Sequence, residues 1–376
     1  MNEQEAHIAL SLSNGLGPQR YADLLARLGS AKAVVEADHA TLCDAGLSTR
    51  AIDGLRAVDQ KAIEGVLSWA DGEQRHLLTP ADEDYPALLH DLPDAPFLLY
   101  VRGDPIALQT PQIAIIGSRN PTSGGLHNAG QFARHLAAGG LTVTSGLALG
   151  VDSAAHAGAL AVSGRTVAVT GTGPDRVYPA SNRQLAGDIL ESGGAIVTEF
   201  PPGTPARPGH FPRRNRLISG LSAGTLVVEA GIRSGSLITA RLALEQGREV
   251  FAIPGSIHNP LARGCHSLIR DGAAKLVETA ADIMDELPAL LGMGLTEKAD
   301  TATSESAGTA ATGADPEHAK VLDALGHDPV PMDILLQRTG LTAAELSSIL
   351  LILELQGRVT SMPGGRYARV WHEGLK

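Results

Sequence analysis

Short runs of apolar residues recur through the middle of the chain, between about residues 96 and 290. Most are four to six residues long, as expected of strands that are buried on both faces. Stretches with helical periodicity separate them, such as HNAGQFARHLAAGG and GSLITARLALEQG. The apolar runs are FLLYV, IAIIGS, LTVTSG, TVAVTG, AIVTEF, TLVVEA, EVFAIPG and KLVE. This alternation predicts an α/β fold with a doubly wound, mostly parallel sheet.

The N-terminal region, residues 1–75, has the pattern of several short helices. The stretch LSNGLGPQRYADLLARLGS contains a tight turn at residues 15–17 and a helix opened by Pro18, which is typical of a helix-hairpin-helix or SAM-like domain. The backbone N–H groups of such a turn can face a phosphate. Residues 1–100 hold 7 basic and 16 acidic side chains, so we favour the alternative of a small helical bundle that uses glycine only to turn.

The C-terminal quarter divides into a linker and a small domain. Residues 292–317 are rich in Ala, Thr, Ser and Gly, which predicts a flexible linker after a central domain over 76–291. Residues 318–376 show three helical patterns and then a hairpin turning at residues 363–365, the order of a winged helix. The third helix carries no Arg or Lys before Arg358, so we expect protein contact or a structural role there, not duplex DNA.

The distribution of charge changes this picture more than the net charge of −11 does. Residues 101–275 hold 16 basic side chains against 10 acidic ones, whereas the flanks hold 14 against 31. A basic centre between acidic flanks suits an anionic ligand. A GC-rich genome would explain why Arg outnumbers Lys 24 to 6, but it would not explain where the positive charge lies.

Several classes of protein are not expected from this composition. Cys43 and Cys265 are the only cysteines and the histidines form no HExxH pattern, so we predict neither a disulfide framework nor a metal site. No apolar run reaches the ~18 residues that a membrane span needs. The N-terminus lacks the basic segment of a secretory signal, so a cytoplasmic location is expected. A nicotinamide cofactor is not expected either, because no G-x-G-x-x-G pattern is present.

The residues that follow the predicted strands carry the candidate chemistry, because ligands of such sheets bind at the carboxyl ends of the strands. After IAIIG come Ser118 and Arg119, then a glycine-containing loop and a helix start; these suit a phosphate. After TLVVEA, the run Ser234-Gly235-Ser236 opens another helix with free N–H groups and hydroxyls. Together with the arginine-rich strand end described next, they make three anion-suited strand ends in one sheet, which predict an anion-binding track.

The run GHFPRRNRLISG, residues 209–220, gathers three arginines beside one aromatic. With a helix beginning at about Asn215, the cations and the helix start would meet phosphates while a base stacks on Phe211. The alternative is that Phe211 lies in the core and some arginines pair with Glu199 or Glu229. We expect both kinds of contact among the three.

Another strand end, TSGLALGVDSAAH, places Asp152 and His156 one helical turn apart. Such a pair suggests catalysis, but no nucleophile elbow accompanies it. We therefore expect a capping carboxylate and a hydrogen-bonded histidine. Asn182, in GTGPDRVYPASNRQL, is expected to cap a helix or to bind a ligand.

These motifs resemble those of the DNA-processing protein family DprA, also called Smf. The similar runs are IAIIGSRNPT, SGLALGVDSAAH, GTGPDRVYP, FPRRNRLISGLS, VVEAGIRSGSLITARLALEQGREVFAIPG and LIRDGA, in this order between about residues 105 and 280. The resemblance implies an extended Rossmann domain that binds single-stranded DNA in a positively charged pocket. It also implies a homodimer without catalytic activity that loads the recombinase RecA during natural transformation, with single-stranded-DNA-binding protein as a further partner.

Carried over position by position, the resemblance completes the set of candidate DNA contacts. They are Ser118, Arg119, Gly209, Phe211, Arg214, Asn215, Arg216, Ser234, Gly235 and Ser236. Two positions depart from the family pattern: Leu149 stands where a basic residue is frequent, and His266 where Asn is common. A nucleotide hydrolase with a Rossmann-like fold is the alternative function, but its P-G-G-x-G-T signature is replaced here by EAGIRSGS. A regulator that binds DNA through the winged helix is a third.

Overall fold

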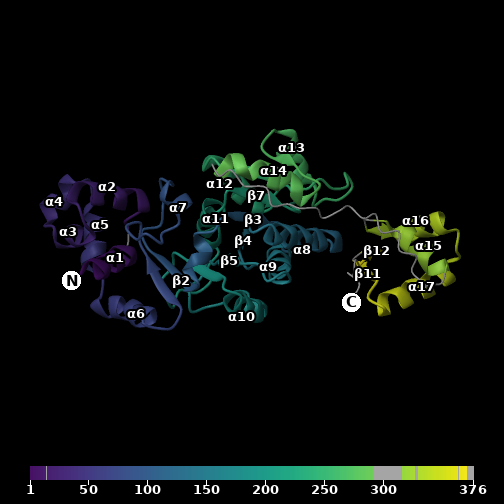
Figure 1. Cartoon of the computed structure of the whole chain (residues 1–376), viewed down its shortest axis with the longest axis horizontal. Helices are drawn as coiled ribbons and strands as arrows, with labels where there is room; N and C mark the ends of the chain where they lie inside the picture. The colour runs from purple at the N-terminus through teal and green to yellow at the C-terminus, as the bar shows by residue number, and fades with distance from the viewer. Residues whose placement is uncertain (14, 292–315, 327–328, 363, 371–376) are drawn as a thin grey trace.

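A computed structural model describes residues 1–13, 15–291, 316–326, 329–362 and 364–370. Figure 1 shows a helical N-terminal region, a central sheet covered by helices, and a small C-terminal unit, following one another along the long axis. No helix in these described ranges is both long and apolar enough to cross a membrane.

The N-terminal region consists of six short helices, most of them capped by a polar side chain. They are α1 (Glu3–Leu12), α2 (Pro18–Leu28), α3 (Ala31–Glu36), α4 (His39–Asp44), α5 (Thr49–Arg56) and α6 (Gln60–Ala70). As predicted, α2 begins at Pro18. The carboxylate of Glu3 accepts the backbone N–H groups of Ala31 and Lys32, which ties α1 to the start of α3. These helices share one apolar cluster with Phe97, Leu98 and Tyr100, which joins them to the edge of the central sheet.

The central sheet has nine strands in the described part of the chain, in the order β1-β2-β6-β5-β4-β3-β7-β8-β9. Their bounds are β1 (Arg75–Leu78), β2 (Leu99–Gly103), β3 (Gln112–Ile116), β4 (Thr142–Ser145), β5 (Thr166–Val169), β6 (Ala195–Thr198), β7 (Gly224–Val227), β8 (Glu249–Ala252) and β9 (Lys275–Leu276). Strands β3 to β9 run parallel, and β2 is antiparallel to both its neighbours. The mostly parallel sheet is confirmed, and all eight predicted runs form strands. Strand β1 was not predicted, because only Leu78 of its four residues is buried.

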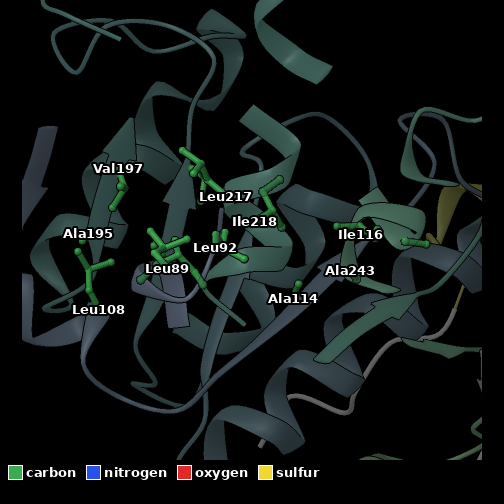
Figure 2. Packing of buried hydrophobic residues seen from close by; sticks show 14 of the residues in the cluster. Leu89, Leu92, Leu108, Ala114, Ile116, Ala195, Val197, Leu217, Ile218 and Ala243 are labelled. Carbon is green, nitrogen blue, oxygen red and sulfur yellow. The ribbon is translucent and has the colours of Figure 1, made fainter. Parts of the chain in front are cut away.

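Helices cover both faces of this sheet, which makes the fold doubly wound. They are α7 (Ala87–His90), α8 (Ser123–Ala138), α9 (Val151–Leu160), α10 (Arg183–Glu191), α11 (His210–Gly220), α12 (Ser236–Glu245), α13 (Arg263–Arg270) and α14 (Ala280–Leu291), with the short 3-10 helices η1 (Pro105–Leu108) and η2 (Ala180–Asn182). Because side chains alternate along a strand, β3 serves both cores. Ala114 and Ile116 pack on the same side as Leu217 and Ile218 of α11 (Figure 2). Ile113 and Ile115 point to the other face of the sheet, towards α8 and α9.

The order of the strands reverses at β3, and this reversal positions the candidate site. The chain passes from β3 to β4, β5 and β6 on one side, and then returns to β7, β8 and β9 on the other. Connections leaving β3 and β7 therefore diverge to opposite faces of the sheet, and a crevice opens outside the carboxyl ends of these strands.

The C-terminal unit contains three helices and a three-stranded sheet, which confirms the predicted winged-helix order. Its elements are α15 (Pro316–Leu325), β10 (Val330–Pro331), α16 (Met332–Thr339), α17 (Ala343–Leu355), β11 (Val359–Met362) and β12 (Arg366–Arg369). The strands pair in the order β10-β12-β11 around a core that includes Leu335, Leu346 and Leu350. Of the linker predicted over 292–317, all but the last two residues lie outside the described ranges, and these two begin α15.

Helices α8 and α9 lie side by side (Figure 1) and approach closely at two glycines. A Cβ on Gly158 would lie 2.3 Å from the carbonyl oxygen of Gly130, so Gly158→Ala must push the helices apart. We expect the substitution to lower the free energy of unfolding by about 2 kcal/mol, the usual cost of overpacking. Urea denaturation followed by circular dichroism measures this.

Gly65→Ala is the control for that substitution, since Gly65 lies in α6 and a Cβ there meets no atom within 4 Å. It should leave stability unchanged or raise it by up to about 1 kcal/mol, the advantage of Ala over Gly in a helix. Equal effects of the two substitutions would show that the contact between α8 and α9 is not tight.

His156 of α9 is fully buried, and its Nδ1 lies 2.6 Å from the hydroxyl of Thr166. Burial, with the charge of Arg214 as a smaller cause, lowers the pKa of His156 to about 3. Below about pH 6.5 the unfolded chain therefore binds a proton that the folded protein cannot take up. Between that pH and about 3, this histidine should remove stability as the pH falls, with a slope approaching ~1.4 kcal/mol per pH unit.

Denaturation of wild type and His156→Gln between pH 7 and pH 4 checks this expectation. The variant cannot titrate at this position, so its stability should depend less on pH, whatever its stability at neutral pH. His258→Gln, at an exposed position, should keep the pH dependence of the wild type. Identical slopes for wild type and His156→Gln would mean that the buried ring is protonated as readily as in the unfolded chain.

Candidate nucleic-acid interface

A cavity of about 640 Å³ lies at the carboxyl ends of the central strands. Its walls come from the loops after β3, β4, β5 and β7 and from α11. Seven of the ten residues predicted as DNA contacts line it: Arg119, Phe211, Arg214, Asn215, Ser234, Gly235 and Ser236. The reversal of strand order thus gathers residues that lie far apart in the sequence.

Two aromatic rings and a guanidinium form one face of the cavity. Phe211 is half-buried, and its ring centroid lies 5.6 Å from that of Tyr178, which is half-exposed. The guanidinium of Arg119 lies over the ring of Phe211, 5.5 Å from its centroid. A cation over a ring is held by the quadrupole of the ring. The exposed Arg119 is therefore positioned by Phe211, and the rings present a surface on which a planar base can stack.

Arg214 is a buried cation in the wall of the cavity. It is 4% exposed and donates a hydrogen bond to the carbonyl oxygen of Val169, at the end of β5. Its guanidinium lies over Gly146, where a Cβ would be 2.1 Å from Nη1, so only glycine fits below it. Burial lowers the pKa of Arg214 to about 10, against the opposing effect of Asp152. The side chain therefore keeps its charge at neutral pH.

Asp152 and His156 are directed to different partners. The carboxylate of Asp152 accepts the N–H groups of Gly146 and Ala148, and burial raises its pKa although Arg214 and these hydrogen bonds oppose the shift. His156 is turned towards Thr166 and does not line the cavity. Asp152 thus holds the loop after β4 and does not cap α9 as expected, because the start of this helix has no side-chain cap. His156 is hydrogen-bonded, as expected, to Thr166 at the start of β5.

The loop after β7 brings small residues to the opposite wall of the cavity. The hydroxyls of Ser234 and Ser236 lie 2.6 Å apart, and Ser236 begins α12. The hydroxyl of Ser234 also accepts the N–H group of Ser236, at 3.3 Å, so the free N–H groups predicted here are partly used within the loop. A Cβ on Gly235 would meet no atom within 4 Å, so the backbone there is open to a ligand. Hydroxyls at a helix start are suited to a phosphate oxygen.

The helix after β3 does not offer the free N-terminus that the sequence suggested. Thr122 caps α8, and the carboxylate of Glu229 accepts both the N–H group and the hydroxyl of Thr122, at 2.9 and 2.7 Å. A Cβ on Gly125 would lie 2.5 Å from this carboxylate. The anion at this helix start is thus supplied by the protein itself, and in this loop Arg119 is the residue that remains for a ligand.

The cluster of three arginines is divided by the fold, which corrects the prediction for Arg216. Arg216 is 7% exposed and pairs with Glu199 at 2.6 Å and with Asp94 at 3.3 Å, outside the cavity. Arg213 also pairs with Glu199, at 2.9 Å. The expected pairing with Glu199 therefore holds for two arginines, and only Arg214 lines the cavity. Helix α11 begins at His210, five residues before the predicted start at Asn215.

Ser118 and Gly209 lie near the cavity but do not line it. The hydroxyl of Ser118 accepts the N–H group of Asn120, and its carbonyl oxygen accepts that of Val151. Gly209 is the exposed residue that precedes α11. Both residues shape the loops that carry Arg119 and Phe211.

Sequence reasoning missed Tyr178 and left the role of Asn182 open. The signal for Tyr178 was its position in a strand-end run, GTGPDRVYP, in which it is the one aromatic residue. Asn182 does not cap a helix; its amide donates to the carbonyl oxygens of Leu147 and Ala148 and so braces the loop after β4. Leu149 in that loop is exposed. The family pattern frequently has a basic residue at this position.

The described ranges contain no group of three or more His, Cys, Asp or Glu side chains that could hold a metal ion. Comparison with known proteins shows the family to which the chain belongs. The family model for DNA recombination-mediator protein A matches residues 76–288, and a model for the DprA winged helix domain matches residues 305–365.

Relatives agree with these matches over most of the chain. Protein Smf of Escherichia coli is 40% identical over 333 residues, covering 89% of this chain and 87% of its own length. The X-ray structure of DNA processing protein A from Streptococcus pneumoniae superposes with a TM-score of 0.67 at 35% identity, over 76% of this chain and 99% of that one. DNA processing protein A from Helicobacter pylori, described with a single-stranded DNA binding mode, gives 0.52 at 31% identity, over 57% and 96%. By its sequence, its fold and its winged helix, the chain belongs to the DNA recombination-mediator protein A family, whose members include the DprA and Smf proteins.

Proposed function

We propose that this protein binds single-stranded DNA in the cavity at the strand ends and acts there as a recombination mediator. It would protect incoming strands in the cytoplasm and load RecA onto them during natural transformation. The observation that carries the proposal is the combination of aromatic rings, one exposed and one buried arginine, and serine hydroxyls at a helix start within a single cavity. Family membership supports it, as does the single-strand binding described for the relative from H. pylori.

The residues that line the cavity suggest how a single strand would be bound. A base would stack beside Phe211 and Tyr178, which tolerates any sequence because every base has a flat face. Arg119 would hold a phosphate through two N–H groups, and the loop from Ser234 to Ser236 would hold another through backbone and hydroxyl donors. Arg214, which keeps its charge although it is buried, would contribute positive charge to the wall of the cavity.

The mediator role rests on coating strands and on presenting them to RecA. A homodimer would join two cavities, and two linked sites raise avidity without a new contact. We propose no catalytic step, because Asp152 accepts N–H groups of the loop after β4 and His156 is hydrogen-bonded to Thr166 of β5. No feature of the described chain favours the alternative of a nucleotide hydrolase over strand binding.

Arg119→Ala tests the site directly. Because an exposed phosphate contact is lost, we expect the affinity for a ~30-nucleotide single strand to fall about tenfold, and the dependence of log K on log salt to become shallower by ~0.7. Fluorescence anisotropy across a salt series measures both quantities, with the matching duplex as a second ligand that wild type should bind more weakly.

Arg165→Ala is the matched control, since Arg165 is also exposed but precedes β5, at the amino end of the sheet. It should bind like the wild type. In the same samples, wild type but not Arg119→Ala should speed the assembly of RecA on strands covered by single-stranded-DNA-binding protein. Weak binding of single strand and duplex by the wild type would contradict the proposal.

Phe211→Leu tests stacking separately from charge. Loss of a base–aromatic contact costs ~1–3 kcal/mol, so affinity should fall between about 5-fold and 150-fold while the salt dependence stays unchanged. Phe211→Tyr keeps a ring and should bind like the wild type. If Phe211→Leu binds as well as Phe211→Tyr, no base stacks at this position.

A further inference from the structure

A second cavity, of about 610 Å³, lies next to the first. The two share Tyr178, whose exposed ring forms part of both walls. Three arginines from separate elements line the second cavity: Arg102 of β2, Arg176 of the loop after β5, and Arg183 at the start of α10. None of them belongs to the residues predicted as DNA contacts.

The charges in this second cavity are not balanced. Asp175 is the only acidic residue in its lining; it lies 3.6 Å from Arg176 and also accepts the N–H group of Gly203. Arg102 and Arg183 have no carboxylate within ion-pair distance among the residues that the structure describes. Two guanidinium groups therefore stay available for an anion.

The remaining walls suit a chain of nucleotides better than a small ion. Helix α10 starts at Arg183 directly after η2, and the carbonyl oxygen of Ala180 accepts the N–H group of Arg183. The guanidinium of Arg183 is therefore what this helix start offers to a ligand. Val177 and Leu190 supply an apolar lining beside the arginines. Phosphates are bound by cations, and bases need apolar surface, so both parts of a nucleotide find contacts here.

We propose that this second cavity is a further subsite for the same single strand. The strand leaves the first cavity across the ring of Tyr178, and its next phosphates bind Arg102 and Arg183. The inference rests on the proposed function, since it extends the path of a strand that is already held beside Phe211. It assigns Tyr178 the role of the stacking surface between the two subsites.

The test uses strands of two lengths on the full chain. An oligo(dT) of about 4 nucleotides fills the first cavity only, whereas one of about 16 nucleotides extends past it. The double variant Arg102→Ala/Arg183→Ala should bind the short strand like the wild type. Its affinity for the long strand should fall about tenfold or more, with a salt dependence shallower by ~1.4, because two phosphate contacts are lost.

The control variant Arg20→Ala/Arg50→Ala removes two exposed arginines from the N-terminal helices and should bind both strands like the wild type. Arg183→Ala alone changes one exposed residue at a helix start, so it should fold normally and show half of the change in salt dependence. Thermal denaturation of every variant confirms that the fold is intact.

Two results would overturn the second subsite while leaving the proposed function in place. In one, the double variant binds the long strand with wild-type affinity and salt dependence although Arg119→Ala weakens it. In the other, the double variant loses the short strand as strongly as the long one, so the arginines act on the first cavity. If the wild type binds neither strand, both proposals fail together.

Discussion

The carboxylate of Glu199 fixes the helix on which the site depends. It stands just after β6, with its side chain 3% exposed, and it holds Arg213 and Arg216 on consecutive turns of the first half of α11. The attraction within a buried ion pair roughly offsets the free-energy cost of removing both charges from water, so the pair adds little net stability. Removing one partner leaves an uncompensated buried charge and costs about 3–5 kcal/mol. The pair therefore acts mainly on the orientation of α11. With two arginines turned towards Glu199, the same helix directs Phe211 and Arg214 into the cavity.

Most of the fold could be predicted from the sequence, because strands buried on both faces leave continuous apolar runs that few other structures produce. Strand β1 was not predicted because it lies at the edge of the sheet, where only the last residue of RHLL is buried. The start of α11 was placed at about Asn215, after Pro212, whereas proline also fits the first turn of a helix and α11 begins at His210. Local patterns fixed the type of each element more firmly than its ends.

The site could be predicted in its location but not in the direction of each side chain. Arg214 and Arg216 are two positions apart in α11, so they point away from each other, and the register of the helix decides which one meets the cavity. The sequence could suggest Glu199 as a partner for some arginine but could not say for which. Tyr178 entered the site through the loop after β5, whose path depends on contacts with α11 that no local pattern records.

Glu229 gives the protein an internal substitute for a ligand. In dinucleotide-binding folds of this topology, the pyrophosphate of the cofactor lies at the N-terminus of the first helix after the central strand. Here that place is filled by a carboxylate held by Thr122 and, at 3.2 Å, by the amide of Asn259. A dinucleotide placed here would meet a carboxylate, whereas dinucleotide-binding folds offer N–H donors at this helix start. Like charges repel, so this placement is unfavourable. Because this helix start is already occupied by the protein's own carboxylate, an anionic ligand of the sheet is directed to the neighbouring cavity, where Arg119 and Arg214 lie.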